Sequence, residues 1–421
     1  MSTRFLLTCG VLVALLPAVV AADPWPQWRG PGGVGVCNET DLPTAWSASE
    51  NVTWKVALPG PGNSTPIVWK DHLFLTQATS RGAQRSLMCF DRADGKMRWT
   101  KAVETRPDEL THKTNPYCAS SATTDGRAVY VWHGSAGAFA YDFSGRELWR
   151  RDLGTFTHIW GYASSPVLYG DNVIISAGPG LNVFLIALDK KTGQVAWKTP
   201  LPAATSREAK QFKGSWSTPV LRRANGRDEL ILSLPGRVVG FDPGTGEELW
   251  HCDGLTDLAY TSPLVGPDGH VVAMSGYGGA ALGLDARGDG DLTSRRLWLV
   301  PNKKNPQRVG SGVIVGDHIY ILNAPGVAHC IELKTGRIVW QQRLGKRSSS
   351  WSSMVHADGH LYVNDMQGDT YILDPSPTYR LVRTNPIGEM TRASLAFSDG
   401  QVFIRTYEHL YCIGPRRGQG G

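Results

Sequence analysis

Short apolar runs that alternate with polar residues recur along the chain from about residue 51. Three stretches illustrate the pattern: SSPVLYGDNVIISAG from Ser164, TSPLVGPDGHVVAMSG from Thr261 and SSMVHADGHLYVNDMQG from Ser352. In each stretch an alternating run, a Gly-Asp or Asp-Gly turn and a second run make up a β-hairpin. The pattern predicts an all-β protein built from short antiparallel strands.

An eleven-residue unit follows these hairpins and repeats along the chain. It runs from a small residue to a Trp at Cys89–Trp99, Ala187–Trp197, Gly240–Trp250 and Cys330–Trp340; Ala140–Trp149 is one residue shorter, and Gly283–Trp298 has a longer loop. The glycine in its Thr-Gly, Asp-Gly or Ser-Gly pair accepts the positive φ of a hairpin turn. The small residue leaves room for the indole, which can bury on the order of 200 Å². We therefore interpret the unit as architecture and assign no chemistry to it.

The repeat predicts an eight-bladed β-propeller with four-stranded antiparallel blades. Two hairpins per repeat, at intervals of roughly 40 to 50 residues, are typical of propeller blades. The structural tryptophans expected to dock between blades are Trp54, Trp99, Trp149, Trp197, Trp250, Trp298 and Trp340. An eighth unit, at 372–381, has lost its Trp, and the last repeat stops at Cys412 without an outer strand. Residues 52–58 can supply that N-terminal strand and close the ring, which leaves no free edge.

The first 22 residues are typical of a cleaved signal peptide, because Arg4 precedes an apolar stretch and Ala21-Ala22 offers a cleavage site. This predicts a periplasmic or secreted protein with no integral membrane segment after cleavage. The expected organisation is a signal peptide at 1–22, a lead segment at 23–50, the propeller at 51–414 and a flexible tail at 415–421. The formal charge of +6 is spread along 43 basic and 37 acidic residues, so a nucleic-acid partner is not expected.

The mature chain would keep six of the seven cysteines, namely Cys37, Cys89, Cys118, Cys252, Cys330 and Cys412. An even number permits disulfides in an oxidising compartment, and the spacing does not fix their connectivity. Cys89, Cys330 and Cys412 occupy the small-residue position of the repeat. At that position a buried thiol serves as a small apolar side chain.

The unit A-x-D-x-x-T-G-x-x-x-W resembles the tryptophan-docking motif of the pyrroloquinoline-quinone (PQQ) repeat family. That family includes quinoprotein alcohol dehydrogenases and the outer-membrane assembly lipoprotein BamB, which are eight-bladed propellers. The segment WPQWRGPGGVGV from Trp25 resembles the lead of secreted PQQ-like propeller proteins of planctomycete bacteria, as do THKTNPYCASS, HIWGYASSP and GSWSTP. The resemblance covers roughly residues 51–414 and implies a fold shared by enzymes and non-enzymes.

The chain departs from the dehydrogenases of that family at the residues that carry their chemistry. Those enzymes have two adjacent cysteines against the quinone, whereas no two cysteines are neighbours here. We find neither their Ca²⁺-binding Glu, Asn and Asp set nor a C-x-x-C-H haem site. The residues expected to hold PQQ with Ca²⁺ are thus missing, and no cofactor and no metal site is predicted. An enzyme, if this chain were one, would be a quinoprotein-type dehydrogenase.

Loops that lead into the innermost strand of each blade gather around a propeller axis and can line a funnel. Aromatic, polar and cationic residues recur in these loops, and they are the candidate ligand-binding set: His112, Asn115, Tyr117, His158, Trp160, Tyr162, Trp216, Tyr260, Trp351 and Arg392. Such residues can hold a planar, sugar-like or anionic ligand. They can equally seal the tops of their own blades, so packing remains the alternative.

We expect a monomeric, non-catalytic interaction or assembly scaffold, because strong repeats occur without a recognisable catalytic group. Its partner would be a protein or a cell-envelope glycan, bound through the loop face. The alternatives are a quinoprotein-like oxidoreductase and a carbohydrate-binding propeller that uses the funnel.

Overall fold

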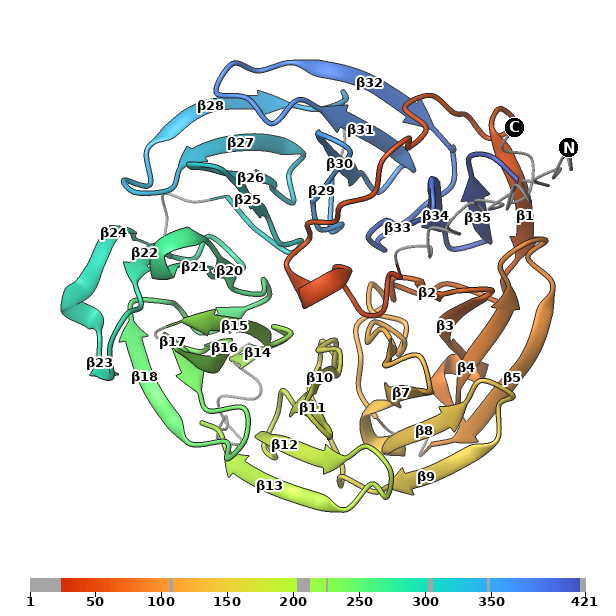
Figure 1. Cartoon of the computed structure of the whole chain (residues 1–421), viewed down its shortest axis with the longest axis horizontal. Coiled ribbons are helices and arrows are strands. Elements are labelled where there is room, and N and C mark those ends of the chain that lie inside the picture. Colours follow the sequence, from red (N-terminus) through yellow and green to blue (C-terminus); the bar gives the residue numbers. More distant parts are fainter. Residues whose placement is uncertain are drawn as a thin grey trace, which may run out of the picture.

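The computed structural model describes residues 24–416 except 106–108, 203–212, 225, 302–305 and 347–348. The predicted signal peptide at 1–22 and the last five residues of the predicted tail lie outside the described residues. Within them the strands form eight blades around one axis (Figure 1), and we number the blades from 1 to 8 in chain order from β2. The predicted eight-bladed all-β propeller is confirmed.

The first four blades each contain four antiparallel strands in chain order. Blade 1 comprises β2 (Ile67–Trp69), β3 (His72–Thr79), β4 (Gln84–Asp91) and β5 (Met97–Glu104). Blade 2 comprises β6 (Thr123–Thr124), β7 (Ala128–Trp132), β8 (Ala138–Asp142) and β9 (Glu147–Arg151). Blade 3 comprises β10 (Val167–Tyr169), β11 (Asn172–Ala177), β12 (Phe184–Asp189) and β13 (Val195–Pro200). Blade 4 comprises β15 (Val220–Ala224), β16 (Arg227–Leu234), β17 (Arg237–Phe241) and β18 (Glu248–Asp253).

The next three blades repeat the arrangement. Blade 5 comprises β20 (Leu264–Val265), β21 (His270–Met274), β22 (Ala281–Asp285) and β24 (Arg296–Val300). Blade 6 comprises β25 (Val313–Val315), β26 (His318–Leu322), β27 (Val327–Glu332) and β28 (Ile338–Arg343). Blade 7 comprises β29 (Val355–Ala357), β30 (His360–Asn364), β31 (Asp369–Leu373) and β32 (Leu381–Pro386).

Blade 8 joins the two ends of the propeller. It comprises β33 (Ala396–Ser398), β34 (Gln401–Arg405) and β35 (His409–Ile413), with β1 (Val52–Ala57) as the outer strand. β1 pairs antiparallel with β35, and Trp54 lies opposite Cys412. The expected closure by the N-terminal strand is confirmed.

The remaining elements are short. They are the strands β14 (Gly214–Ser215), β19 (Leu258–Ala259) and β23 (Gly290–Asp291), and the 3₁₀ turns η1 (Pro31–Gly33), η2 (Ser80–Gly82), η3 (Gly134–Ala136), η4 (Pro267–Gly269) and η5 (Thr293–Arg295). β14 pairs with β19, and β23 adds to the outer edge of blade 4 in parallel with β18.

The repeated small residue and Trp lie opposite each other on neighbouring strands, as their spacing suggested. Cys89 pairs with Trp99, Ala187 with Trp197 and Gly283 with Trp298. A Cβ on Gly283 would lie 2.4 Å from the indole Nε1 of Trp298, so no larger side chain fits there without displacement.

Six of the seven repeat tryptophans bridge to the following blade. Each donates its Nε1–H to a backbone carbonyl at 2.7 to 3.2 Å, in the pairs Trp54–Arg92, Trp99–Phe143, Trp149–Lys190, Trp197–Pro243, Trp298–Leu333 and Trp340–Ser376. Five indoles also cover the turn glycine of that blade, where a Cβ would come within 2.4 to 2.8 Å of the ring; these glycines are Gly95, Gly145, Gly193, Gly246 and Gly336. The repeat glycine therefore serves the close approach of the neighbouring indole as well as the positive φ.

A belt of hydroxyl groups ties the innermost strands together around the axis. In each step the backbone N–H of one blade donates to a side-chain hydroxyl of the next at 2.8 to 3.0 Å: Thr65 to Ser121, Ser121 to Ser165, Ser165 to Thr218, Thr218 to Ser262, Ser262 to Ser311, Ser311 to Ser353 and Ser353 to Ser394. These bonds pair backbone donors that are buried and have no partner in their own sheet. The belt therefore links each inner-strand entry to the next, from blade 1 to blade 8.

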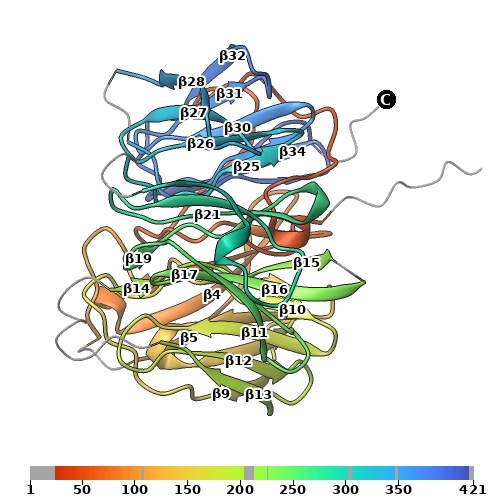
Figure 2. The same cartoon turned by 90° about the vertical axis from the view of Figure 1, so that its left-hand side faces the viewer.

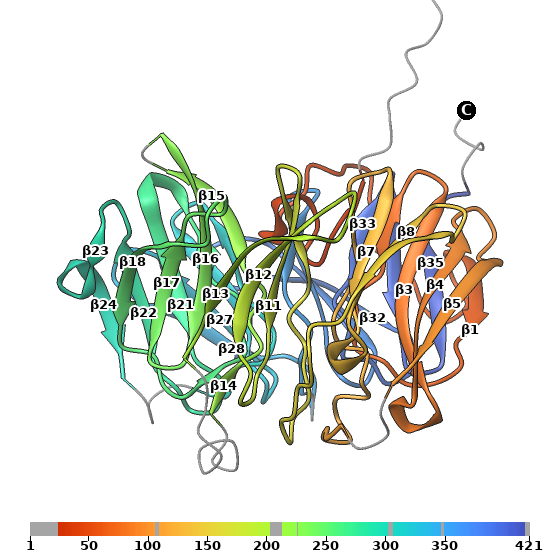
Figure 3. The same cartoon turned by 90° about the horizontal axis from the view of Figure 1, so that it is seen from below.

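The described part of the lead segment, residues 24–50, crosses the axis from blade 1 to blade 7 (Figure 1). Trp25 and Val68 exchange two backbone hydrogen bonds of 2.9 and 2.8 Å, and the N–H of Cys37 donates to the carbonyl of His356 at 3.1 Å. Between these contacts the guanidinium of Arg29, fully buried, donates to the carbonyl of Gly312. In the edge-on view the lead segment lies on the opposite side of the disc from β14 and the loops beside it (Figure 3).

Apolar cores lie between consecutive blades. One cluster joins blades 2 and 3, and the next joins blades 3 and 4. A further cluster joins blades 7, 8 and 1 and includes Trp25, Leu42 and Trp46 of the lead segment. The blades that stack side by side in Figure 2 therefore have separate apolar cores between them, and the lead segment belongs to the one that joins blades 7, 8 and 1.

Candidate functional site

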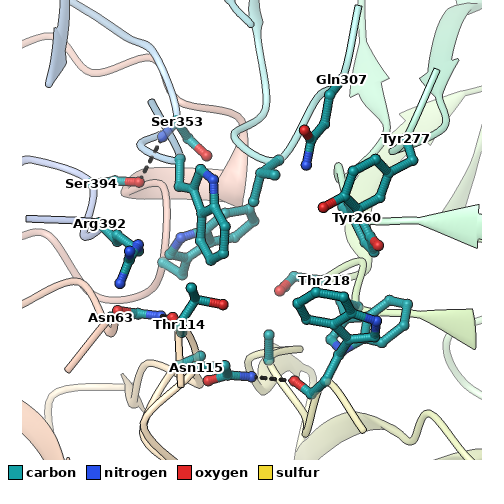
Figure 4. A pocket seen from close by; sticks show the side chains of 17 residues that line it. Asn63, Thr114, Asn115, Thr218, Tyr260, Tyr277, Gln307, Ser353, Arg392 and Ser394 are labelled. Carbon is teal, nitrogen blue, oxygen red and sulfur yellow. Dashed lines mark hydrogen bonds between the residues drawn. The ribbon is translucent and has the colours of Figure 1, made fainter. Parts of the chain in front are cut away.

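A cavity of about 150 Å³ lies at the axis, on the face where the chain passes from each outer strand to the next inner strand. We call this the funnel face. The cavity is lined by Trp28, Asn63, Thr114, Asn115, Ala119, Trp160, Ala163, Trp216, Thr218, Tyr260, Tyr277, Gln307, Val309, Trp351, Ser353, Arg392 and Ser394 (Figure 4). The lining comes from the eight loops that lead into the inner strands, one hairpin loop and the lead segment.

The floor of the cavity comes from the lead segment. Trp28 lines the cavity from the face opposite the funnel mouth, just before η1. Gly30 permits the tight path here, because its φ is +73° and a Cβ would lie 2.6 Å from the ring of Trp25. The axis is therefore blocked beneath the cavity, which makes it a blind funnel.

Aromatic rings form one wall in an edge-to-face chain. Trp216 and Tyr260 lie 5.0 Å apart at 72°, and Tyr260 and Tyr277 lie 6.0 Å apart at 76°. The edge of one ring against the face of the next is a favourable arrangement of their quadrupoles. The Nε1–H of Trp216 donates to the carbonyl of Gly161 at 2.8 Å, which fixes the indole in place.

Arg392 is the cation of the opposite wall. Its guanidinium lies 4.9 Å from the ring centroid of Trp351 and 5.3 Å from that of Tyr407, and it donates to the hydroxyl of Tyr407. Among the described residues no carboxylate pairs with it. Asn63 lies beside Arg392 in Figure 4 and donates to the carbonyl of Thr114 at 2.8 Å.

Six of the ten predicted ligand-binding residues line the cavity: Asn115, Trp160, Trp216, Tyr260, Trp351 and Arg392. The other four, His112, Tyr117, His158 and Tyr162, lie behind the lining. His112 packs 4.4 Å from the ring of Trp160, and His158 packs edge-on against Trp216 at 4.9 Å. Burial lowers the pKa of His158 to about 4, so its imidazole is neutral at pH 7 and supports the indole by packing.

Tyr117 and Tyr162 enclose a buried ion pair. Arg85 lies 5.1 Å from the ring of Tyr117 and 5.4 Å from that of Tyr162, and its guanidinium contacts the Glu109 carboxylate at 2.9 Å. The hydroxyl of Tyr162 donates to the carbonyl of Tyr117 at 2.7 Å. These contacts hold the loop that carries Asn115, so both tyrosines support the cavity from behind.

Sequence reasoning missed Trp28, Asn63, Tyr277 and Gln307. Tyr277 belongs to a hairpin loop, and the prediction considered only loops that lead into inner strands. Trp28 belongs to the lead segment, for which no path was predicted. The glycines after Trp28 were the available signal in the sequence, because glycine is the usual residue where the chain needs a positive φ. In the structure Gly30, Gly32, Gly33 and Gly35 all have positive φ values.

The lining does not suit the cofactor that the family resemblance implies. A quinone-bound Ca²⁺ takes oxygen ligands that include carboxylates, and the described lining contains no Asp, Glu, His or Cys. The six described cysteines are buried, none of them lines the cavity, and no disulfide joins any two of them. No step through PQQ is therefore derived for this chain.

One possible metal-ligating group occurs away from the funnel among the described residues: Glu389, Glu408 and His409, whose ligand atoms lie within 4.8 Å of one another. Protein donors already bind its central carboxylate. Lys55 Nζ lies 2.9 Å from Glu389, and the hydroxyl of Tyr411 donates to it at 2.6 Å. This group therefore ties β1 to blade 8.

In the part of the chain that the structure describes, no helix has the length and apolar character needed to cross a membrane.

Comparison with known structures gives the same fold at low sequence identity. BamB from Moraxella catarrhalis aligns over 87% of this chain and 98% of its own, with a TM-score of 0.60 and 15% identity. A europium-containing methanol dehydrogenase aligns over 93% and 98%, with a TM-score of 0.70 and 11% identity. The computationally designed protein Ika8 also aligns, with a TM-score of 0.57. BamB, a methanol dehydrogenase and a computational design thus share this propeller, so the likeness establishes fold alone.

Comparison of sequences identifies the family to which the chain belongs. Outer membrane protein assembly factor BamB of Burkholderia pseudomallei is 30% identical over 118 residues, and that of Yersinia pestis is 24% identical over 285 residues. The matches span 30% and 66% of the length of these two curated relatives, and 28% and 66% of this chain. The family described as outer membrane protein assembly factor BamB matches residues 83–342 and 235–419, which is most of the chain. The chain belongs to this family of PQQ-like repeat propellers.

Proposed function

We propose that this chain is an exported, non-catalytic scaffold that binds a protein partner through its funnel face, in the manner of an outer-membrane assembly factor. Export is supported by the leader pattern of residues 1–22, and the role in assembly is supported by membership of the BamB family.

The distribution of exposed apolar side chains carries the proposal. Among the described residues, the large exposed hydrophobics fall into two groups. Seven lie on the outer strands, which are Met97, Leu148, Val195, Leu297, Leu299, Ile338 and Leu381; four lie on loops of the funnel face, which are Leu110, Leu181, Tyr277 and Met390. The opposite face has none of this set. Apolar side chains on the loops of one face mark an interaction surface.

The composition of the funnel supports binding without catalysis. General acid, base and covalent catalysis mostly use imidazole, carboxylate, thiol or amine groups. The described lining offers aromatic rings, amides, hydroxyls and one guanidinium. A quinoprotein dehydrogenase is the less favoured alternative, because the lining residues that the structure describes include no donor set for Ca²⁺ and quinone.

Site-specific photocrosslinking in cells that express the full chain tests the proposal. A photoreactive phenylalanine at Leu110 or Met390 should give adducts with a protein partner. Matched positions on outer strands are Leu148 and Ile338, which are 40% and 47% exposed against 51% and 44% for the funnel-face pair. These control positions should give none.

Adducts from the outer-strand positions alone, or equally from both sets, would contradict the proposal. Dye reduction by the purified protein supplied with an alcohol, PQQ and Ca²⁺ would contradict its non-catalytic part. We expect no reduction above the protein-free rate.

A further inference from the structure

We infer that the axial funnel binds one pyranose ring that carries a carboxylate, such as a uronic acid at the end of a glycan. The inference rests on the proposed function only in treating the funnel face as a binding surface. It assigns a ligand to the funnel. Leu110, Leu181 and Met390, which we call the rim and which would contact a protein, do not line the cavity.

The blind shape limits the ligand to a single ring or a chain end. Trp28 closes the axis below the cavity, and the lead segment beneath it is held by hydrogen bonds to both blade 1 and blade 7. A polymer cannot pass through the propeller here. The cavity of about 150 Å³ is suited to a small cyclic group.

The guanidinium of Arg392 favours an anionic ligand. Its guanidinium is held between Trp351 and Tyr407, and no described carboxylate neutralises it. A partly desolvated guanidinium gains most from a carboxylate, to which it can donate two parallel hydrogen bonds. A neutral sugar would leave this charge without a counterion.

The wall opposite Arg392, formed by Gln307, Tyr260 and Tyr277, favours a ligand with hydroxyl groups. Figure 4 shows the amide of Gln307 and the rings of Tyr260 and Tyr277 on the side of the cavity away from Arg392. No hydrogen bond to another described residue engages the Gln307 amide or either phenol, so these groups are free to pair with a ligand. A planar aromatic acid would satisfy Arg392 and the indoles but would offer these groups no partner.

A carboxylated pyranose satisfies both walls together. Its C–H faces can pack against the indoles of Trp160, Trp216 and Trp351, its hydroxyls can pair with the amide and phenols, and its carboxylate can face Arg392. The arrangement assigns Arg392 to anion recognition and Gln307 to hydroxyl recognition.

Calorimetry and tryptophan fluorescence with the full mature chain test this inference, with glucuronate, glucose and benzoate as probes. We expect glucuronate to bind at least about tenfold more tightly than glucose, because one ion pair of moderate strength gives that ratio. Arg392→Gln should reduce the ratio to near one. Gln307→Ala should weaken the binding of both sugars and leave the affinity for benzoate unchanged.

Arg150→Gln is the matched control, because Arg150 lies on β9 and pairs only with the exposed carboxylate of Glu147. It should leave the affinity for every probe unchanged. If Arg392→Gln does not fold, Arg392→Lys keeps the charge and removes the planar pair of donors, and it should still weaken glucuronate more than glucose.

Equal affinity for glucose and glucuronate, benzoate binding as tight as glucuronate, or no binding of glucuronate up to tens of millimolar would each overturn the inference. None of these results affects the crosslinks from Leu110 and Met390, so the ligand of the funnel and the partner of the rim can fail independently.

Discussion

The repeat tryptophan forms different hydrogen bonds at the interface between blades 2 and 3, where it is Trp149, and at that between blades 4 and 5, where it is Trp250. Trp149 donates to the Lys190 carbonyl of the next blade and covers Gly193 there. Trp250 instead donates to the Glu229 carboxylate of its own blade at 3.0 Å. Blade 5 has a longer loop in place of the short glycine turn, and no carbonyl is bound there by Trp250. A repeat residue thus keeps its packing position while its polar partner changes with the neighbouring loop.

The substitute partner brings a buried charge with it. The Glu229 side chain is fully buried and contacts Arg222 at 2.7 Å and Arg227 at 3.0 Å. Arg222 is itself buried and also donates to the carbonyls of Gly269 and Ala286 in blade 5. The arginine therefore joins blades 4 and 5, as the indole does at the regular interfaces.

The largest expected effect comes from neutralising that carboxylate. Glu229→Gln keeps an acceptor for Trp250 but leaves the buried guanidinium of Arg222 without its counterion, whereas Arg227 keeps its pair with Asp289. Breaking a buried ion pair costs about 3–5 kcal/mol. Chemical denaturation should show a loss of this size in the free energy of unfolding. Glu248→Gln is the control, because its contacts with Arg237 at 3.5 Å and His251 at 2.8 Å are partly exposed, and it should cost less than about 1 kcal/mol. Equal effects of the two substitutions would show that Glu229 does not hold this interface.

The repeat alone predicted the regular interfaces but gave no sign of this one. Small residue, turn glycine and Trp are short-range signals, since strand pairing and turn conformation fix all three within eleven residues. Glu229 and Arg222 lie on β16 and β15, outside the unit, and the folding of the whole blade-4 sheet brings them to Trp250. The missing Trp of blade 7 has a related cause: the outer strand of blade 8 is β1, so no hairpin turn joins β35 to an outer strand for that Trp to cover. There Asn385 of β32 binds the lead segment instead, and accepts from the N–H of Trp46 at 3.0 Å.

The residues of the candidate site also fall into those that the repeat predicts and those that only long-range contacts place. Trp216, Trp351 and Arg392 were predictable, because each lies at the same position in its own repeat, just before an inner strand. Trp28 lies in a segment without a repeat, and long-range contacts alone place it beneath the cavity. The hydroxyl belt could have been read from the recurring Ser-Ser and Ser-Thr pairs before the inner strands, whose regular spacing places one hydroxyl per blade near the axis.

Alanine substitutions at two glycines, one at each kind of interface, give a further comparison. Gly193 and Gly290 have φ values of +67° and +71°, so alanine causes similar backbone strain at both. A Cβ at Gly193 would lie 2.6 Å from the ring of Trp149, whereas a Cβ at Gly290, opposite Trp250, would meet nothing within 4 Å. Gly193→Ala should therefore destabilise the protein by about 1–3 kcal/mol more than Gly290→Ala, as overpacking does elsewhere. Thermal unfolding of the two variants measures the difference, and a difference near zero would mean that the indole yields without cost.

The closure of the ring differs from both interfaces, because there a largely buried carboxylate, that of Glu389, binds residues from both ends of the propeller, Lys55 of β1 and Tyr411 of β35. Although burial raises the pKa of Glu389, hydrogen bonds from Thr406, Tyr411, Lys55 and His409 outweigh it and lower that pKa to about 2 from its ordinary 4.5. A carboxylate with a lowered pKa stabilises the folded state above pH 4.5, and this contribution disappears as the pH falls towards 2.

Glu389→Gln tests that contribution and should have the smallest effect of the three. It should cost about 1–2 kcal/mol at pH 7, which is the usual range for hydrogen bonds to a charged group. Its deficit relative to the wild type should shrink as the pH falls from 4.5 towards 2, because the wild-type carboxyl then gains a proton and loses its attraction to Lys55. Unfolding of both proteins across this pH range gives the difference directly. Glu408→Gln, at the exposed neighbour, should show neither the deficit nor its pH dependence, and a constant deficit for Glu389→Gln would mean that its hydrogen bonds matter and its charge does not.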